Sequence, residues 1–291
     1  MNGKITYVSP ASLGALRTIL SGTESRAVLG GGQFLIPQLP TLRDSPFDLL
    51  VDLRRVPESL VLARSAGGLL VGAALPLADI ANSSLVRADA PLLAHVAGNV
   101  ADQQTRAMAT LGGSVGLADP ASDLCAVLLA LGAEVEICAS TGKDVIGIER
   151  AFSAQRESAI GREVACTAFR LPRLPAGAGW AYRAVRPRRG AHSTVGVAVV
   201  RSATEAVVAV TSMYVRPGRA REVERALASG APPHEAAERL SAGAHPIVDG
   251  DGDARYRISV ATRLIYRALT AIAGRGGEGL RDHLSVTQAA R

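Results

Sequence analysis

The chain has 291 residues, of which 48% are hydrophobic, 20% charged and only 3% aromatic, and its formal net charge at pH 7 is +6. This length and hydrophobic fraction indicate a globular protein with more than one folding unit. The positive charge comes without a helix-turn-helix, zinc-finger or RNA-binding signature and with few aromatic rings to stack on bases, so we predict no nucleic-acid partner.

The first predicted unit is a small α/β subdomain. Residues 4–8, 26–29 and 49–53 have the apolar composition of short buried strands. After Ser12, apolar residues recur at helical spacing and predict an amphipathic helix. The strand at residues 26–29 leads directly into three consecutive glycines.

The second predicted unit begins with a hairpin at residues 60–73 and continues with helical patterns at residues 77–82 and 91–100. Residues 110–123 are rich in Gly, Ala and Asp and predict a loop, followed by an apolar helix that stops at Gly132. Further strands are predicted at residues 134–138, 143–147 and 164–171.

Residues 172–179 are rich in Pro and Gly and predict a linker, so we place the main domain boundary near Pro175. Beyond it, three strands and three helices are expected at residues 180–185, 195–201, 206–215, 220–228, 233–242 and 260–273. We expect residues 282–291 to be poorly ordered. The predicted units are residues 1–57, 58–174 and 175–285.

The first glycine-rich loop contains Gly30, Gly31, Gly32, Gln33, Phe34 and Leu35. Consecutive glycines after a strand let the backbone approach a ligand closely, and successive amides then form a nest for an anion such as pyrophosphate. The loop lacks the GxGxxG dinucleotide fingerprint. Taken alone, the three glycines favour a tight turn that binds nothing.

The second glycine-rich loop offers a pair of adjacent glycines, hydroxyl donors at Thr110 and Ser114, and carboxylates at Asp119 and Asp123. Asp123 stands at the entry to the next helix, where it can cap the helix or accept a hydrogen bond from a sugar hydroxyl. The candidate binding residues of this loop are Thr110, Gly112, Gly113, Ser114, Asp119 and Asp123.

The remaining residue types predict neither a metal site nor a membrane anchor. Three widely spaced cysteines fit no disulfide framework, zinc site or iron–sulfur motif. The histidines have no metal-ligand spacing, although His192 is a candidate acid–base group, and the DGDGD run at residues 249–253 is interpreted as a solvated turn. Without a signal peptide or a membrane-length apolar run, we expect a cytoplasmic protein.

The two loops together, in this order, resemble those of a known family. The segment GGGQFLIPQL is similar to the AGGxSLxP loop, and TLGGSVGLADPASDL to the TIGGNxxxADPxxDL loop, of the FAD-binding subunit of molybdenum hydroxylases. This family includes the medium subunit of carbon monoxide dehydrogenase and the flavin domain of xanthine dehydrogenase. The resemblance covers nearly the whole chain, through the further segments LLVDLRRVPE, GGLLVGAALPLADI, GREVACTAFRLP and DARYRISVATRLIYRAL.

The resemblance implies an α+β protein, in which a two-subdomain, PCMH-like FAD-binding fold precedes a C-terminal domain with a three-stranded antiparallel sheet and helices. It implies that both loops surround the pyrophosphate of FAD and that Asp123 contacts the cofactor. It also implies an iron–sulfur small subunit and a molybdenum-cofactor large subunit as partners. Electrons would then pass through FAD to NAD+, a quinone or oxygen.

Several residues depart from the family pattern. The usual RNRGT segment reads Arg106-Ala107-Met108-Ala109-Thr110 here, and Phe34 replaces the serine of the first loop. Ala184 replaces a lysine used near FAD, and Ala191 replaces an aspartate. Three interpretations remain open: a divergent subunit of a molybdenum hydroxylase, a free-standing FAD-dependent oxidoreductase that acts on a small molecule in a biosynthetic pathway, and a descendant that has lost flavin.

Overall fold

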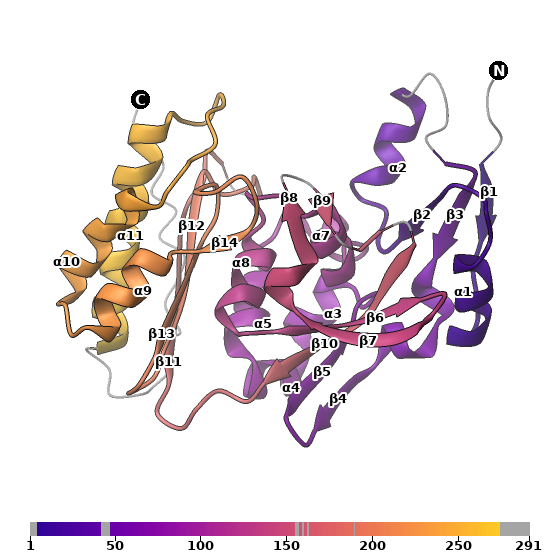
Figure 1. The fold of residues 1–291 in the computed structure, drawn as a ribbon, viewed down its shortest axis with the longest axis horizontal. Coiled ribbons are helices and arrows are strands. Elements are labelled where there is room, and N and C mark those ends of the chain that lie inside the picture. The colour runs from indigo at the N-terminus through magenta and orange to yellow at the C-terminus, as the bar shows by residue number, and fades with distance from the viewer. Residues whose placement is uncertain are drawn as a thin grey trace.

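The structure is a computed structural model that describes residues 5–41, 47–154, 157–158, 160–161, 163–188 and 190–273. It confirms the α+β architecture, with a small parallel sheet at one end, a central antiparallel sheet and a C-terminal sheet flanked by helices (Figure 1). The tail predicted to be poorly ordered, residues 282–291, lies outside the described residues.

The first subdomain is a three-stranded parallel sheet with the order β1-β3-β2. Its helix α1 begins after Ser12, whose hydroxyl accepts a hydrogen bond from the Ala15 amide at 3.1 Å and so caps the first turn. Because the strands are parallel, their carboxyl ends share one edge, and the first glycine loop leaves from that edge. The elements are β1 (Thr6–Val8), α1 (Leu13–Leu20), β2 (Arg26–Leu29), α2 (Leu35–Gln38) and β3 (Leu49–Asp52).

Asp52 closes this edge beside the loop. It pairs in register with Leu29, the residue before Gly30, and its side chain is buried. The Tyr7 hydroxyl donates to its Oδ2 at 2.5 Å, and the Arg54 guanidinium donates to the same oxygen at 2.7 Å. Burial alone would raise the pKa of Asp52, but these hydrogen bonds outweigh burial and hold the pKa below its usual value.

The second subdomain contains a five-stranded antiparallel sheet with the order β4-β5-β10-β6-β7. Strand β10 comes last in the sequence and lies in the middle, where it joins the β4-β5 hairpin to the β6-β7 hairpin. A separate pair, β8 (Phe152–Ala154) and β9 (Glu157–Ser158), completes this region. The five strands are β4 (Leu62–Ser65), β5 (Gly68–Gly72), β6 (Glu134–Ala139), β7 (Gly142–Gly147) and β10 (Val164–Pro172).

The helices of this subdomain include one that contradicts the sequence prediction. Residues 111–117, expected as a loop, form α7, because the Thr110 hydroxyl caps its first turn and Leu111 and Val115 are fully buried. This packing outweighs the low helix propensity of its glycines. Helices α4 and α6 were not predicted. The set is α3 (Leu77–Asn82), α4 (Ser84–Asp89), α5 (Pro91–Ala97), α6 (Gln103–Arg106), α7 (Leu111–Leu117) and α8 (Asp123–Ala130).

The C-terminal domain contains the three expected antiparallel strands, and a two-residue strand, β14, extends their sheet. Strand β13 ends earlier than predicted, because Ser212 turns with a φ of 60° and its amide donates to the Pro120 carbonyl instead of the sheet. Helix α11 begins earlier than predicted. The elements are β11 (Gly179–Val185), β12 (Val195–Arg201), β13 (Ala206–Val210), β14 (Gly218–Arg219), α9 (Arg221–Ala228), α10 (Pro233–Glu238) and α11 (Ala254–Ala273).

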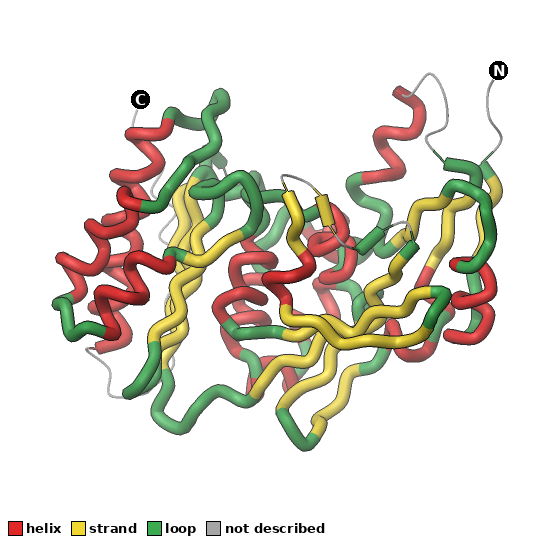
Figure 2. The backbone as a smooth tube through the Cα atoms, in the orientation of Figure 1, coloured by secondary structure: helices red, strands yellow, loops and turns green. Residues whose placement is uncertain are grey.

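Helix α8 joins the second subdomain to the C-terminal domain. All eight of its residues are buried, because it packs against α5 and also against one face of the C-terminal sheet. Trp180, Tyr182 and Ala198 of that sheet belong to the same core as α8. Helix α11 covers the opposite face of the sheet (Figure 2). The linker at residues 173–178 therefore connects two units that share a hydrophobic core.

Within the described residues, no helix is long and apolar enough to cross a membrane.

We predict that the Asp52 network makes stability fall in acid. Asp52→Asn should cost about 2 kcal/mol at pH 7, because a charge-assisted network with Arg54 and Tyr7 is lost. The pKa of folded Asp52 lies below its usual value of 3.8, so the stabilisation is complete above pH 3.8 and is lost as the pH falls through the lower pKa of the folded state. Chemical denaturation at several pH values measures both effects.

The exposed Asp251→Asn is the control and should change the free energy of unfolding by less than about 0.5 kcal/mol at pH 7. A parent-to-variant difference at Asp52 that stays constant as the solution is acidified below pH 3.8 would contradict the assignment.

Candidate functional site

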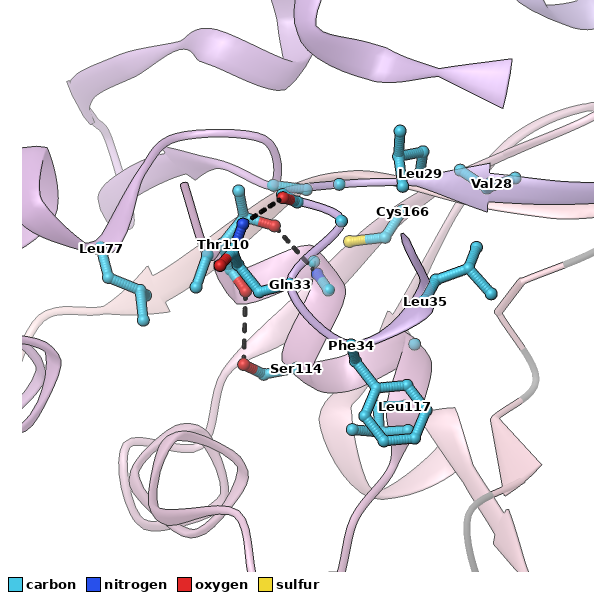
Figure 3. Close-up of a pocket in the computed structure, with 18 of the residues that line it drawn as sticks. Val28, Leu29, Gln33, Phe34, Leu35, Leu77, Thr110, Ser114, Leu117 and Cys166 are labelled. Carbon is cyan, nitrogen blue, oxygen red and sulfur yellow. Dashed lines mark hydrogen bonds between the residues drawn. The ribbon is translucent and has the colours of Figure 1, made fainter. Parts of the chain in front are cut away.

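A cavity of about 390 Å³ lies where the three units meet. Its lining combines the first glycine loop with the start of α7 (Figure 3). His192 of the C-terminal domain also lines it. This volume is typical of a site for an organic ligand. The predicted residues that line it are Gly30, Gly31, Gly32, Gln33, Phe34, Leu35, Thr110, Gly112, Gly113 and Ser114.

The first loop presents unused amides to this cavity. The backbone amides of residues 31–34 donate no hydrogen bond to any residue that the structure describes. Gly32 has a φ of +73°, which favours glycine. Within the loop, the Gln33 side-chain amide donates to the Gly31 carbonyl at 3.3 Å. The loop therefore has the open amides expected of an anion-binding nest.

The two glycine loops are in backbone contact. A Cβ added to Gly31 would overlap the Met108 carbonyl, and one added to Gly30 would lie 2.5 Å from the Thr110 hydroxyl oxygen. A Cβ on Gly112 would lie 2.8 Å from the Ala73 carbonyl oxygen. These three glycines are therefore required by close packing, which the sequence alone did not reveal.

The second loop forms part of the cavity wall, but its glycine amides are already used in hydrogen bonds within the protein. The Gly113 amide donates to the Thr110 hydroxyl at 3.0 Å, and the Gly112 amide donates to the Ala73 carbonyl at 2.9 Å. The Ser114 hydroxyl donates to the Thr110 carbonyl at 3.3 Å (Figure 3). What this loop offers a ligand is a glycine surface together with the positive end of the α7 dipole.

Phe34 stands at the mouth of the cavity. Its side chain is 45% exposed although it belongs to the lining, which also includes Leu117 (Figure 3). Met108, which replaces a polar family residue, is also exposed. The departures from the family pattern thus make this region more apolar.

Asp119 and Asp123 are not among the residues that line the cavity. The Asp119 Oδ1 atom accepts a hydrogen bond from the Ala121 amide at 2.9 Å, which stabilises the turn before α8. The expected capping role of Asp123 is wrong: Ser122 caps α8, and its hydroxyl accepts from the Cys125 amide at 3.3 Å. The FAD contacts of both aspartates remain predictions.

Asp123 instead belongs to a buried polar cluster between α8 and the C-terminal sheet. Its Oδ2 accepts hydrogen bonds from the Arg186 guanidinium at 2.6 Å and from the Ser193 hydroxyl at 3.0 Å. Its Oδ1 has no partner among the described residues. Burial raises the pKa of Tyr182 well above its usual value and the charge of Asp123 raises it further, so this phenol stays neutral.

Two further lining residues have ionisable side chains. His192, a candidate from the sequence, lines the cavity with an exposed side chain, whereas His95 packs against Trp180 with ring centroids 5.8 Å apart. Cys166 was not predicted to reach the site, and no signal in its sequence neighbourhood indicates that it does. Burial raises the pKa of its thiol, so it remains protonated.

Among the residues that the structure describes, no group of His, Cys, Asp and Glu is placed to hold a metal ion. In the DGDGD segment, Asp249 forms an ion pair with the buried Arg257, and Asp249 and Gly252 bridge across a turn.

Comparison with protein families matches both halves of the chain. Residues 3–174 match the FAD binding domain in molybdopterin dehydrogenase. Residues 180–272 match the CO dehydrogenase flavoprotein C-terminal domain.

Individual relatives match over nearly their full length. The carbon monoxide dehydrogenase medium chain of Hydrogenophaga pseudoflava is 29% identical and is covered to 96%, over 92% of this chain. The nicotine 6-hydroxylase medium subunit of Paenarthrobacter nicotinovorans is 30% identical and is covered to 98%, over 93% of this chain.

The fold is similar to that of solved structures. A chain of the H. pseudoflava carbon monoxide dehydrogenase, in a form that lacks the Mo-pyranopterin moiety, superposes with a TM-score of 0.86 at 28% identity. The match covers 95% of this chain and 99% of that chain. A chain of quinoline 2-oxidoreductase from Pseudomonas putida 86 gives 0.85 at 27% identity, with coverages of 94% and 99%.

We predict that Gly31→Ala lowers the free energy of unfolding by about 2–3 kcal/mol, because the methyl group forces the two loops apart. Gly116→Ala is the matched control: nothing lies within 4 Å of its added Cβ, and alanine favours helix α7 by about 0.5–1 kcal/mol. Denaturant unfolding without added ligand measures both. Equal stability of Gly31→Ala and the parent would show that the loops are not in contact.

Proposed function

The chain belongs to the family of FAD-binding medium subunits of molybdenum hydroxylases, and on this premise we propose that it relays electrons from iron–sulfur clusters to an external acceptor. As a member of this family it is a flavoprotein and an oxidoreductase component. Bound FAD supplies a redox centre that accepts and releases electrons. The residues of this chain bind that cofactor, orient it and shield it.

The cavity supports a specific placement of the cofactor. The open amides of residues 31–34 suit the pyrophosphate, and the start of α7 turns its positive dipole end to the same space. Gly30 brings the first loop against Thr110, and Gly113 lines the cavity where a larger side chain would take up space. Thr110 and Ser114 contribute hydroxyl groups to the lining. We assign Gln33, Phe34 and Leu35 to the wall around the cofactor.

The proposed partners follow from the names of the relatives, which are medium chains and medium subunits. We infer that an iron–sulfur small subunit donates electrons and that a molybdenum-cofactor large subunit carries out the substrate chemistry. NAD+, a quinone or oxygen is the proposed acceptor. The cytoplasmic location expected from the sequence stays a prediction.

A second candidate is a free-standing FAD-dependent oxidoreductase that acts on a small molecule. The observation that favours it is the altered lining: Phe34 and Ala109 border the cavity where the family has a serine and a glycine. An apolar mouth suits an organic substrate beside the cofactor.

Gly113→Val should weaken FAD binding at least tenfold, because the side chain enters the cavity where the backbone meets the cofactor. Titration of purified protein with FAD, followed by flavin fluorescence, gives the dissociation constant. Gly147→Val is the matched control, since that glycine ends β7 with nothing within 4 Å of an added Cβ. Undiminished affinity in Gly113→Val would remove the second loop from the FAD site.

A subunit and a free-standing enzyme differ in the proteins that co-purify with them and in whether the isolated chain turns over a substrate. We predict that tagged protein from its native host co-purifies with an iron–sulfur chain and a large molybdenum chain. Reduction of an acceptor should require both partners, because the molybdenum chain oxidises the substrate and this chain only passes electrons from the iron–sulfur chain to the acceptor. Substrate turnover by the isolated chain with FAD would instead establish the free-standing enzyme.

A further inference from the structure

His192 is the contribution of the C-terminal domain to the cavity. Among the described lining residues, His192 and Cys166 alone have ionisable side chains, and the Cys166 thiol is buried. The other polar groups of the lining are neutral amides and hydroxyls. An imidazole is a hydrogen-bond donor in both its neutral and its charged form. His192 therefore brings a ring N–H donor from the C-terminal domain into the cavity.

The backbone that carries His192 is fixed on its C-terminal side. The hydroxyl of Ser193, the next residue, donates to Asp123 Oδ2 at 3.0 Å. The carbonyl of Thr194 accepts a hydrogen bond from the buried Arg257 guanidinium. Both anchors are buried, so residues 193 and 194 are held in place by charge-assisted hydrogen bonds.

The loop is also fixed on its N-terminal side. Arg186, where the loop begins, donates to the same Asp123 oxygen at 2.6 Å, and its side chain is only 4% exposed. Further along, Gly190 has a φ of +81° and lies against Ala101, the lining residue with a φ of 48°. Asp123 therefore holds both ends of the segment that presents His192.

We propose that His192 donates a hydrogen bond to bound FAD and that Asp123 acts as a positioning residue, which holds this loop through Arg186 and Ser193. This inference rests on the proposed function, because it requires FAD in this cavity. Under this proposal Asp123 affects FAD binding although its side chain does not line the cavity. It also makes the cofactor a contact between the FAD-binding region and the C-terminal domain.

His192→Ala should raise the dissociation constant for FAD about tenfold, the effect of losing one hydrogen bond to a charged group. His192→Gln retains a donor and should recover most of the affinity. His234→Ala is the control, because His234 is an exposed residue of α10 outside the lining and should bind FAD as the parent does. Fluorescence titration measures all four proteins. Parent-like binding by His192→Ala overturns the proposal.

A double-mutant cycle tests the positioning role. Asp123→Asn should weaken FAD binding severalfold in the parent and have no further effect in His192→Ala, because both substitutions remove the same contact. Additive effects would overturn the positioning role and indicate a direct contact between Asp123 and FAD. If Asp123→Asn does not fold, Ser193→Ala replaces it in the cycle, with circular dichroism confirming the fold.

The same titrations separate this inference from the proposed function. A parent protein that binds no FAD overturns both. A parent that binds FAD, and loses it in Gly113→Val but not in His192→Ala, leaves the proposed function standing and overturns the inference.

Discussion

The cavity depends on a contact between two stretches of backbone. Gly30 and Gly31, at the end of a parallel strand, lie so close to residues 108–110 that a Cβ would meet carbonyl and hydroxyl oxygens. This contact joins the first subdomain to the start of α7, and the loop amides without a hydrogen-bond acceptor belong to residues that line the cavity. The first glycine loop, the start of α7 and the glycine surfaces line one cavity because these backbones touch.

Most of the fold could be predicted because its strands and long helices follow strong hydrophobic patterns. The strands at residues 26–29, 180–185 and 195–201 were found within a residue of their ends. Helix α7 could not be, since its glycines have low helix propensity and its stability comes from Thr110 capping and from the burial of Leu111 and Val115. Tertiary packing of this kind leaves little trace in local sequence.

The site was predicted unevenly. The ten predicted residues of the two glycine loops all line the cavity: residues 30–35, 110 and 112–114. They could be predicted because consecutive glycines after a strand let the backbone approach a ligand closely. Asp123 and Asp119 stand close to them in sequence, yet their side chains turn into the protein. Cys166 reaches the cavity through the central strand β10, and only the order of strands in the sheet brings it there. Sequence proximity predicts loop contacts well and contacts through sheet topology poorly.

The burial of helix α8 affects how the protein folds and how its two regions can move. Its eight residues are buried between the central region and the C-terminal sheet. A nascent chain that has emerged only as far as the linker at residues 173–178 exposes the apolar face of α8 to solvent until the C-terminal strands arrive. In the finished protein, a hinge between the two regions would have to expose that face again. The burial of α8 therefore couples the folding of these two regions to each other.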